Sequence, residues 1–266
     1  MTKILAHPSR PDAGCSHGRL LPFVRMLVLA GAVALFAVPA SAWRLAPLSL
    51  ELEPSGRNAQ GVFRIHNEDA EAIAVQVSIA RRSVAEDGTN TMEPSSDEFV
   101  LFPTQLVLQP GKSQAVRVQY KGDRNLIREQ SFRIITEQLP VNLQRERIGG
   151  AQVTMLLRYI GTLYVAPSGS KAAIAIEQAR VEQTTDGKSQ LAVLVVNNGT
   201  KHAFLSEPKL TIRSGGQQTK LERETLTGDL VGANVLAGGK RWFIVPLSAP
   251  LPIGAVEAAL SFEDIL

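Results

Sequence analysis

Short stretches in which apolar and polar residues alternate recur along the chain between turn signals, and no stretch keeps a helical period over three turns. The longest one covers 151–166 and ends at Pro167, because proline cannot donate a hydrogen bond to a β-ladder. Apolar side chains share one face of it at every second position: Val153, Met155, Leu157 and Tyr159. The pattern predicts a long strand. Its apolar face either packs in the chain's own core or forms an exposed edge that binds a strand of another protein.

The region that leads up to this strand predicts an immunoglobulin-like sandwich. Seven or eight short apolar runs, separated by turn signals such as Pro110-Gly111, lie between residues 43 and 167. That number of strands is typical of the immunoglobulin fold. The predicted strands cover 45–52, 61–66, 73–81, 99–102, 106–108, 115–120, 131–136 and 151–166.

A second β-domain is predicted after Pro167. Residues 168–170, Ser-Gly-Ser, form a short flexible joint and the best domain boundary in the chain. Alternation then starts afresh and continues to the end of the sequence, which predicts a smaller β-sandwich over 171–266. The sequence therefore indicates an all-β protein with one sandwich at 43–167, a linker at 168–170 and a second sandwich.

The first 42 residues have the pattern of a signal peptide. An unbroken apolar run at 26–38 follows Arg19 and Arg25, and Ala40-Ser41-Ala42 matches an A-x-A cleavage site. The run is shorter than the roughly 20 residues that span a bilayer, although a membrane anchor is the alternative. The mature chain is expected to begin at Trp43 and to be free of the membrane.

Removal of this leader changes the charge and the cysteine content. The leader holds four basic residues and one acidic residue, so the 28 basic and 25 acidic residues of the whole chain become 24 of each. A neutral chain gives no electrostatic reason to expect nucleic acid or an anionic membrane as a partner. Cys15, the one cysteine, also lies in the leader, so no disulfide is expected in the mature protein.

The residues that remain do not suggest an enzyme. His66 and His202 are the two histidines after the leader, and both fall at predicted turns. The sequence contains no His-x-x-x-His spacing, no glycine-rich phosphate loop and no Gly-x-Ser-x-Gly. We therefore expect no catalytic residues, no metal and no cofactor.

Several strand and turn features occur in an order that resembles a known family. They are the strand at 61–67, Phe102-Pro103 before Pro110-Gly111, Gln114 and Arg117-Val118 after that turn, Arg128-Glu129 before Ser131-Phe132-Arg133-Ile134, Glu137, Pro140, and Leu163-Tyr164-Val165-Ala166-Pro167. Over 43–167 the chain resembles the periplasmic chaperones of the chaperone–usher pilus pathway, and it is most similar to a divergent branch of that family. The resemblance over 168–266 is weak.

This resemblance implies a boomerang of two immunoglobulin-like domains that works in the periplasm without ATP or another cofactor. Its clients are pilin subunits, which lack their final strand and therefore have an open core. The strand at 151–166 fills that gap with Val153, Met155, Leu157 and Tyr159, and the subunit is then delivered to an outer-membrane usher. Because an uncovered apolar edge is an aggregation hazard, the free protein is expected to protect it, for example by self-association.

The sequence departs from the family at the anchor for the subunit's C-terminal carboxylate. The resemblance implies a basic pair, but an ungapped count places its two positions at Glu51 and Thr162. Arginine binds carboxylates through paired hydrogen bonds, so three arginines are candidate anchors. They are Arg158, on the same side of the strand as Thr162, and then Arg133 on the preceding strand and Arg44 at the mature start.

The family also has an ion pair between its two domains. The resemblance implies an acid like Glu137 and an arginine just before the strand-ending proline, but that second place holds Ala166. We therefore expect Glu137 to lie between the domains and to have another partner.

A function of a different class is also compatible with the sequence. An exported β-sandwich could serve as an adhesin or structural module that binds a ligand through its loops. The two hypotheses differ at the strand of residues 151–166. A donor strand needs a free apolar face, whereas a structural sandwich covers that face internally.

Overall fold

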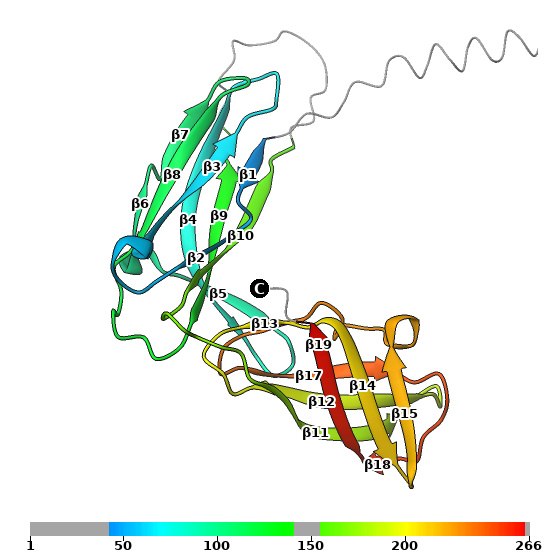
Figure 1. Cartoon of the computed structure of the whole chain (residues 1–266). Coiled ribbons are helices and arrows are strands. Elements are labelled where there is room, and N and C mark those ends of the chain that lie inside the picture. The colour runs from blue at the N-terminus through cyan, green and yellow to red at the C-terminus, as the bar shows by residue number, and fades with distance from the viewer. Residues whose placement is uncertain (1–42, 141–154, 264–266) are drawn as a thin grey trace, which may run out of the picture. The chain divides into compact units, whose positions relative to one another are not determined.

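The computed structural model describes residues 43–140 and 155–263, and nearly all of its regular structure is strand (Figure 1). The predicted leader at 1–42, and Val153 with the rest of 151–154, lie outside these residues. No helix in the described part is long and apolar enough to cross a bilayer. Its helical structure consists of 3-10 turns: η1 (Arg57–Ala59), η2 (Ser96–Glu98) and η3 (Arg223–Thr225). The all-β prediction is confirmed.

Two sheets face each other in the first sandwich. One sheet contains, in spatial order, β1 (Arg44–Ala46), β3 (Gln60–His66), β8 (Ser113–Tyr120) and β6 (Phe99–Phe102). The other contains β2 (Ser49–Leu52), β10 (Arg158–Val165), β9 (Gln130–Gln138), β4 (Ile73–Val84) and β5 (Asn90–Pro94), with β7 (Gln105–Leu108) also paired to β4.

The predicted strand at 45–52 divides between these two sheets. β1 pairs with β3 in the first sheet, whereas β2 runs parallel to β10 in the second. Pro47 lies between β1 and β2 and has no backbone N–H, so it interrupts the ladder where the chain crosses over. This crossing places β2 beside only the second half of β10.

The inward-facing side chains of the two sheets form one core. Its largest fully buried members are Trp43, Phe63, Ile65, Phe132, Ile134 and Leu163. Each side chain of this size stabilises the folded state by about 1.5–3 kcal/mol when it is fully buried. The alternation that predicted the strands is therefore the alternation between core and solvent.

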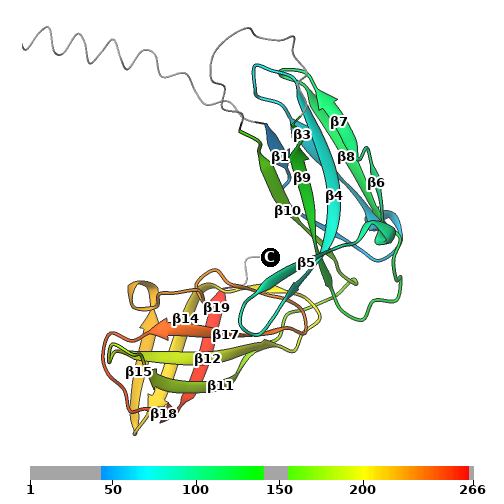
Figure 2. The same cartoon turned by 180° about the vertical axis from the view of Figure 1, so that it is seen from behind.

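The second sandwich has its own two sheets and its own core (Figure 2). The first sheet contains β17 (Lys240–Pro246), β12 (Ser189–Asn197), β11 (Ile174–Gln183) and β18 (Gly254–Ala255). The second contains β15 (Gln217–Glu222), β14 (Ser206–Ser214) and β19 (Glu257–Glu263), and a short pair joins β13 (Ala203–Phe204) to β16 (Asn234–Val235). The prediction of two immunoglobulin-like sandwiches is confirmed.

The central strand is shorter than the sequence pattern predicts. β10 begins at Arg158, and residues 155–157 precede it without strand structure. The last bond between the two strands is donated by the Gln138 N–H to the carbonyl oxygen of Leu157, at 3.0 Å. Pro140 follows two residues later and cannot donate to a ladder, which agrees with the end of the pairing at Leu157 among the described residues.

Candidate functional site

One edge of β10 is open over the first half of the strand. β10 pairs with β9 from Arg158 to Val165, but it pairs with β2 only from Thr162 to Val165. The Thr162 N–H donates to the Leu48 carbonyl at 2.7 Å, which shows that even-numbered residues direct their backbone groups toward β2. No strand in the described part of the chain pairs with this edge at residues 158–161 (Figure 1). An additional strand could therefore pair there.

The predicted donor side chains divide between the protein's own core and solvent. Met155 is 77% exposed. Leu157 and Tyr159 are partly buried against the core, and the Tyr159 ring meets Trp43 edge-on at 4.5 Å. Met155 is therefore the described member of the set that is free to enter another protein.

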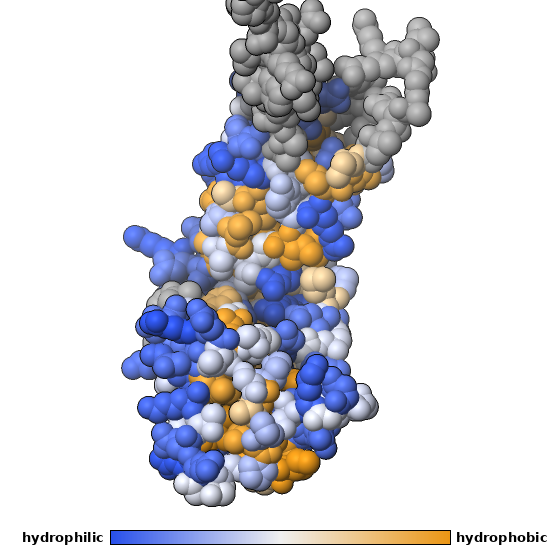
Figure 3. All heavy atoms as spheres, turned by 90° about the vertical axis from the view of Figure 1, so that its right-hand side faces the viewer, coloured by the Kyte–Doolittle hydropathy of each residue, from blue (hydrophilic) through white to orange (hydrophobic). Residues whose placement is uncertain are grey.

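The structure adds apolar side chains that the sequence analysis did not single out. Leu156 and Ile160 are 46% and 44% exposed, and Leu48, beside the open edge, is 63% exposed. Leu156 and Ile160 are even-numbered, unlike Met155, and they flank Arg158 in the sequence. The charged Arg158 between them obscured this second apolar pattern in the sequence analysis. Figure 3 shows apolar patches between charged side chains on the side of the molecule where β10 lies in Figure 1.

The outer face of the same sheet brings residues from three strands together, β10, β9 and β4. Cross-strand register places Thr162 of β10 opposite Arg133 of β9, and Arg133 opposite Ala80 of β4. Arg82 lies two residues after Ala80 and therefore on the same face. The Arg133 guanidinium donates a hydrogen bond to the Thr162 hydroxyl. Arg133 thus lies beside one of the two positions at which the resemblance implies a basic residue.

Arg82 and Arg133 are half-buried cations on the outer face of this sheet. Burial lowers the pKa of both guanidinium groups, and the charge of Arg133 lowers the pKa of Arg82 further. Arg82 Nε donates to Asn90 Oδ1 at 2.8 Å, while its Nη1 is buried with no hydrogen-bond partner in the described part of the chain. Over residues 43–140 and 155–263, no ion pair joins either arginine to a carboxylate. Desolvated guanidinium groups of this kind favour binding of an oxyanion.

The other predicted anchor residues have different surroundings. Arg158 is exposed at the start of β10, opposite Glu137 in the register. Arg44 forms an ion pair with Glu68 at 3.1 Å, and its side chain is 64% exposed. Arg133 is therefore the candidate that the geometry favours, whereas the sequence analysis ranked Arg158 first.

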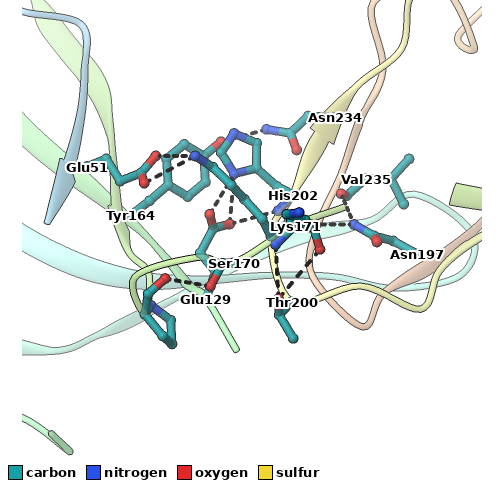
Figure 4. A network of polar contacts seen from close by, with 12 residues as sticks. Glu51, Glu129, Tyr164, Ser170, Lys171, Asn197, Thr200, His202, Asn234 and Val235 are labelled. Carbon is teal, nitrogen blue, oxygen red and sulfur yellow. Dashed lines mark hydrogen bonds and ion pairs between the residues drawn. The ribbon is translucent and has the colours of Figure 1, made fainter. Parts of the chain in front are cut away.

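A buried hydrogen-bonded pair of side chains joins the two sandwiches, and it involves neither Glu137 nor a residue of β10. Glu129, just before β9, accepts hydrogen bonds from His202 of the second sandwich, whose Nδ1 lies 2.8 Å from both carboxylate oxygens (Figure 4). Both side chains are only 1% exposed. The Glu129 N–H also donates to the Thr200 carbonyl at 2.9 Å. Glu129 therefore takes the interdomain role expected for Glu137, which is exposed, and His202 is more than a turn residue.

Two further contacts cross between the sandwiches in this region. Lys201 forms an ion pair with Glu51 at 2.9 Å. Glu51 occupies the other position at which the resemblance implies a basic residue, and it binds a lysine of the second sandwich. Asn234 donates a hydrogen bond to the Tyr164 hydroxyl at 2.7 Å. No cluster of three or more metal-ligating side chains occurs within residues 43–140 and 155–263.

Comparison with known proteins identifies the first sandwich. The family described as pili and flagellar-assembly chaperones, PapD N-terminal domain, matches residues 50–171. This match relates the first sandwich to the pilus-chaperone family. The match covers β10 and most of the strands of the first sandwich, including the open edge and both arginines. None of the curated protein sequences matches the chain.

Solved structures of pilus chaperones share the fold over both sandwiches. The CsuC–CsuE chaperone–tip subunit complex of the archaic Csu pili of Acinetobacter baumannii is 18% identical, with a TM-score of 0.55 over 83% of this chain and 98% of that chain. The class 5 fimbriae chaperone CfaA is 12% identical, with a TM-score of 0.51 over 83% of this chain and 99% of that chain. The chain therefore shares the two-sandwich fold of these structures.

Proposed function

We propose that this protein is a pilus chaperone that acts in the periplasm, binds pilin subunits by donating the open edge of β10, and delivers them to an outer-membrane usher. The observation that carries the proposal is the half-paired β10, with the exposed Met155 just before it. A subunit strand would pair with the backbone groups of Arg158 and Ile160 that point away from β9. Main-chain bonds give affinity in such strand addition, and alternate side chains set the register.

The subunit's C-terminal carboxylate is proposed to bind Arg133, with Arg82 beside it. Arg133 lies on the outer face of the sheet next to Thr162, and both arginines are partly desolvated with no carboxylate partner among the described residues. An incoming carboxylate would supply the missing counter-charge through charge-assisted hydrogen bonds. Arg158 and Arg44 are more exposed, so water screens their charges more strongly.

Replacement of Arg133 by methionine is expected to weaken subunit capture by about 10- to 100-fold, because a hydrogen bond to a charged group contributes about 1.5–3 kcal/mol. The measurement is the equilibrium affinity for a purified subunit, with thermal unfolding to confirm that the variant folds. Arg158→Met is the competing variant. A larger loss in Arg158→Met than in Arg133→Met would move the anchor to β10, as the sequence analysis first predicted.

A second apolar surface is proposed for the usher. Val62, Val100 and Phe102 are 45%, 50% and 72% exposed and border a groove of about 490 Å³ around Arg117 on the β3–β8–β6 sheet. This sheet lies across the core from β10, so the surface stays exposed when a subunit occupies the open edge. Handing over a subunit requires such a free surface on the loaded chaperone.

Replacement of Phe102 by serine is therefore expected to leave subunit capture unchanged and to reduce co-purification of the loaded chaperone with an usher by about tenfold or more. The reason is the loss of a large apolar contact of about 1.5–3 kcal/mol. Loss of subunit capture in this variant, or unchanged usher binding, would exclude the surface.

Co-expression of residues 43–266 with a candidate pilin in the periplasm tests the function as a whole. A one-to-one complex in pull-downs, with degradation of the pilin when it is expressed alone, is the expected result. A stable monomer that leaves the pilin unaffected would favour the alternative of an exported adhesin or structural module. Free chaperone that elutes as a larger species without the pilin would indicate self-association at the open edge.

A further inference from the structure

Tyr164 of β10 lies between the two arginines and the second sandwich. It is 2% exposed, and its side chain is on the same face of the strand as Thr162, two residues earlier. Register places it opposite Ser131, so its ring is a diagonal neighbour of Arg133. Tyr164 thus forms one wall of the proposed carboxylate site.

Residues of the second sandwich hold this tyrosine at both its ring and its hydroxyl. The imidazole of His202 stacks on the ring with 3.8 Å between centroids and 13° between planes. Asn234 Nδ2 donates a hydrogen bond to the hydroxyl at 2.7 Å (Figure 4). A buried tyrosine hydroxyl normally has such a partner, and the bond fixes the direction of the ring.

His202 also binds the nearby acid Glu129, through hydrogen bonds separate from its stack on Tyr164. Glu129 and Arg82 line one cavity of about 290 Å³, so an internal ion pair between them would be electrostatically favourable. Both oxygens of Glu129 instead accept from His202. Burial raises the pKa of Tyr164, the Asn234 hydrogen bond lowers it, and Glu129 raises it again, which agrees with a neutral phenol among these groups. The arginines therefore remain available to an external carboxylate.

We infer that Tyr164 is a positioning residue, which Asn234 and His202 of the second sandwich hold in place so that Arg133 and Arg82 face the client's carboxylate. This inference rests on the proposed function, because it concerns the anchor for the subunit. It also gives the second sandwich a specific role: the second sandwich orders the binding site on the first one.

The test compares two synthetic peptides that carry the last strand of the co-expressed pilin, one with a free C-terminal carboxylate and one with a carboxamide. The full mature chain is expected to bind the acid about 10- to 100-fold more tightly than the amide. Replacement of Tyr164 by phenylalanine removes the hydroxyl and keeps the stacked ring. It is expected to reduce this preference by about three- to tenfold and to leave binding of the amide unchanged, because only the hydrogen bond that orients the ring is lost.

Two other variants complete the design. Asn234→Leu removes the same bond from the other side, so the double variant should lose no more than either single variant. Tyr120→Phe is the matched control, because Tyr120 is 3% exposed but lies on β8 in the other sheet. It should keep the full preference for the acid.

The outcomes separate this inference from the proposed anchor. Equal binding of the two peptides by the unsubstituted chain would overturn the anchor, and the inference with it. An unchanged preference in Tyr164→Phe, or an equal loss for the acid and the amide, would overturn the positioning role alone. Thermal unfolding of each variant confirms that a loss reflects the site and not the fold.

Discussion

Replacement of Met155 by glutamate is expected to abolish capture of pilin subunits while the chaperone stays folded. Met155 is 77% exposed, so the charge is solvated in the free protein and costs little stability. In the complex, the substitution removes an apolar side chain worth about 1.5–3 kcal/mol and places an unpaired carboxylate in the subunit's open core. Together these effects should weaken binding by at least about 100-fold.

The measurement is the equilibrium affinity for a purified subunit, together with the thermal unfolding midpoint. Val107→Glu is the matched control, because Val107 is 56% exposed on β7, away from the open edge. Leu157→Glu is less suitable, since Leu157 packs against the core and the variant would lose stability. Normal subunit binding by Met155→Glu would show that strand donation does not use this register.

Replacement of His202 by alanine is expected to lower the free energy of unfolding by about 3–5 kcal/mol. The reason is that Glu129 would keep its buried position, at 1% exposure, without the partner that binds both of its oxygens. The stacking of His202 on Tyr164 would be lost as well. Urea-induced unfolding at constant pH measures the change.

His66→Ala is the control for this variant, because the His66 side chain hydrogen-bonds the Ser113 hydroxyl at an exposed site, at 2.8 Å. Its free energy of unfolding should change by less than about 1 kcal/mol. A second substitution, Glu129→Gln, should recover part of the stability that His202→Ala loses, because it removes the unpaired charge. A loss in His202→Ala no larger than in His66→Ala would mean that the hydrogen bonds between Glu129 and His202 contribute little to holding the sandwiches together.

The sequence predicted the strands well where one face of a strand is buried. β3, β8 and β9 were found because alternate side chains enter the core, and the two-residue period is visible in the sequence. The start of β10 was predicted too early. Alternation continues before Arg158, but Pro140 ends the neighbouring strand, and pairing depends on the partner as well as on the strand itself.

The candidate site was predicted only in part. Met155 was predicted as a donor residue from periodicity alone. Its exposure in the structure agrees with its place before the first residue of β10. Arg133 was ranked below Arg158, because the sequence does not show which arginine a neighbouring strand shields from water. Glu137 was predicted to lie between the domains, and Glu129 was not considered for this role, because only the tertiary structure shows which acid near β9 meets the second sandwich.

The sequence by itself determined the all-β class, the two sandwiches and the family resemblance, because these depend on local periodicity and on the order of turns. The tertiary structure decided which polar groups meet. Glu129 and His202 are 73 residues apart, Tyr164 and Asn234 are 70 apart, and Glu51 and Lys201 are 150 apart. No local pattern encodes such pairs, since they form only when two independently patterned sandwiches pack against each other and bury the groups between them.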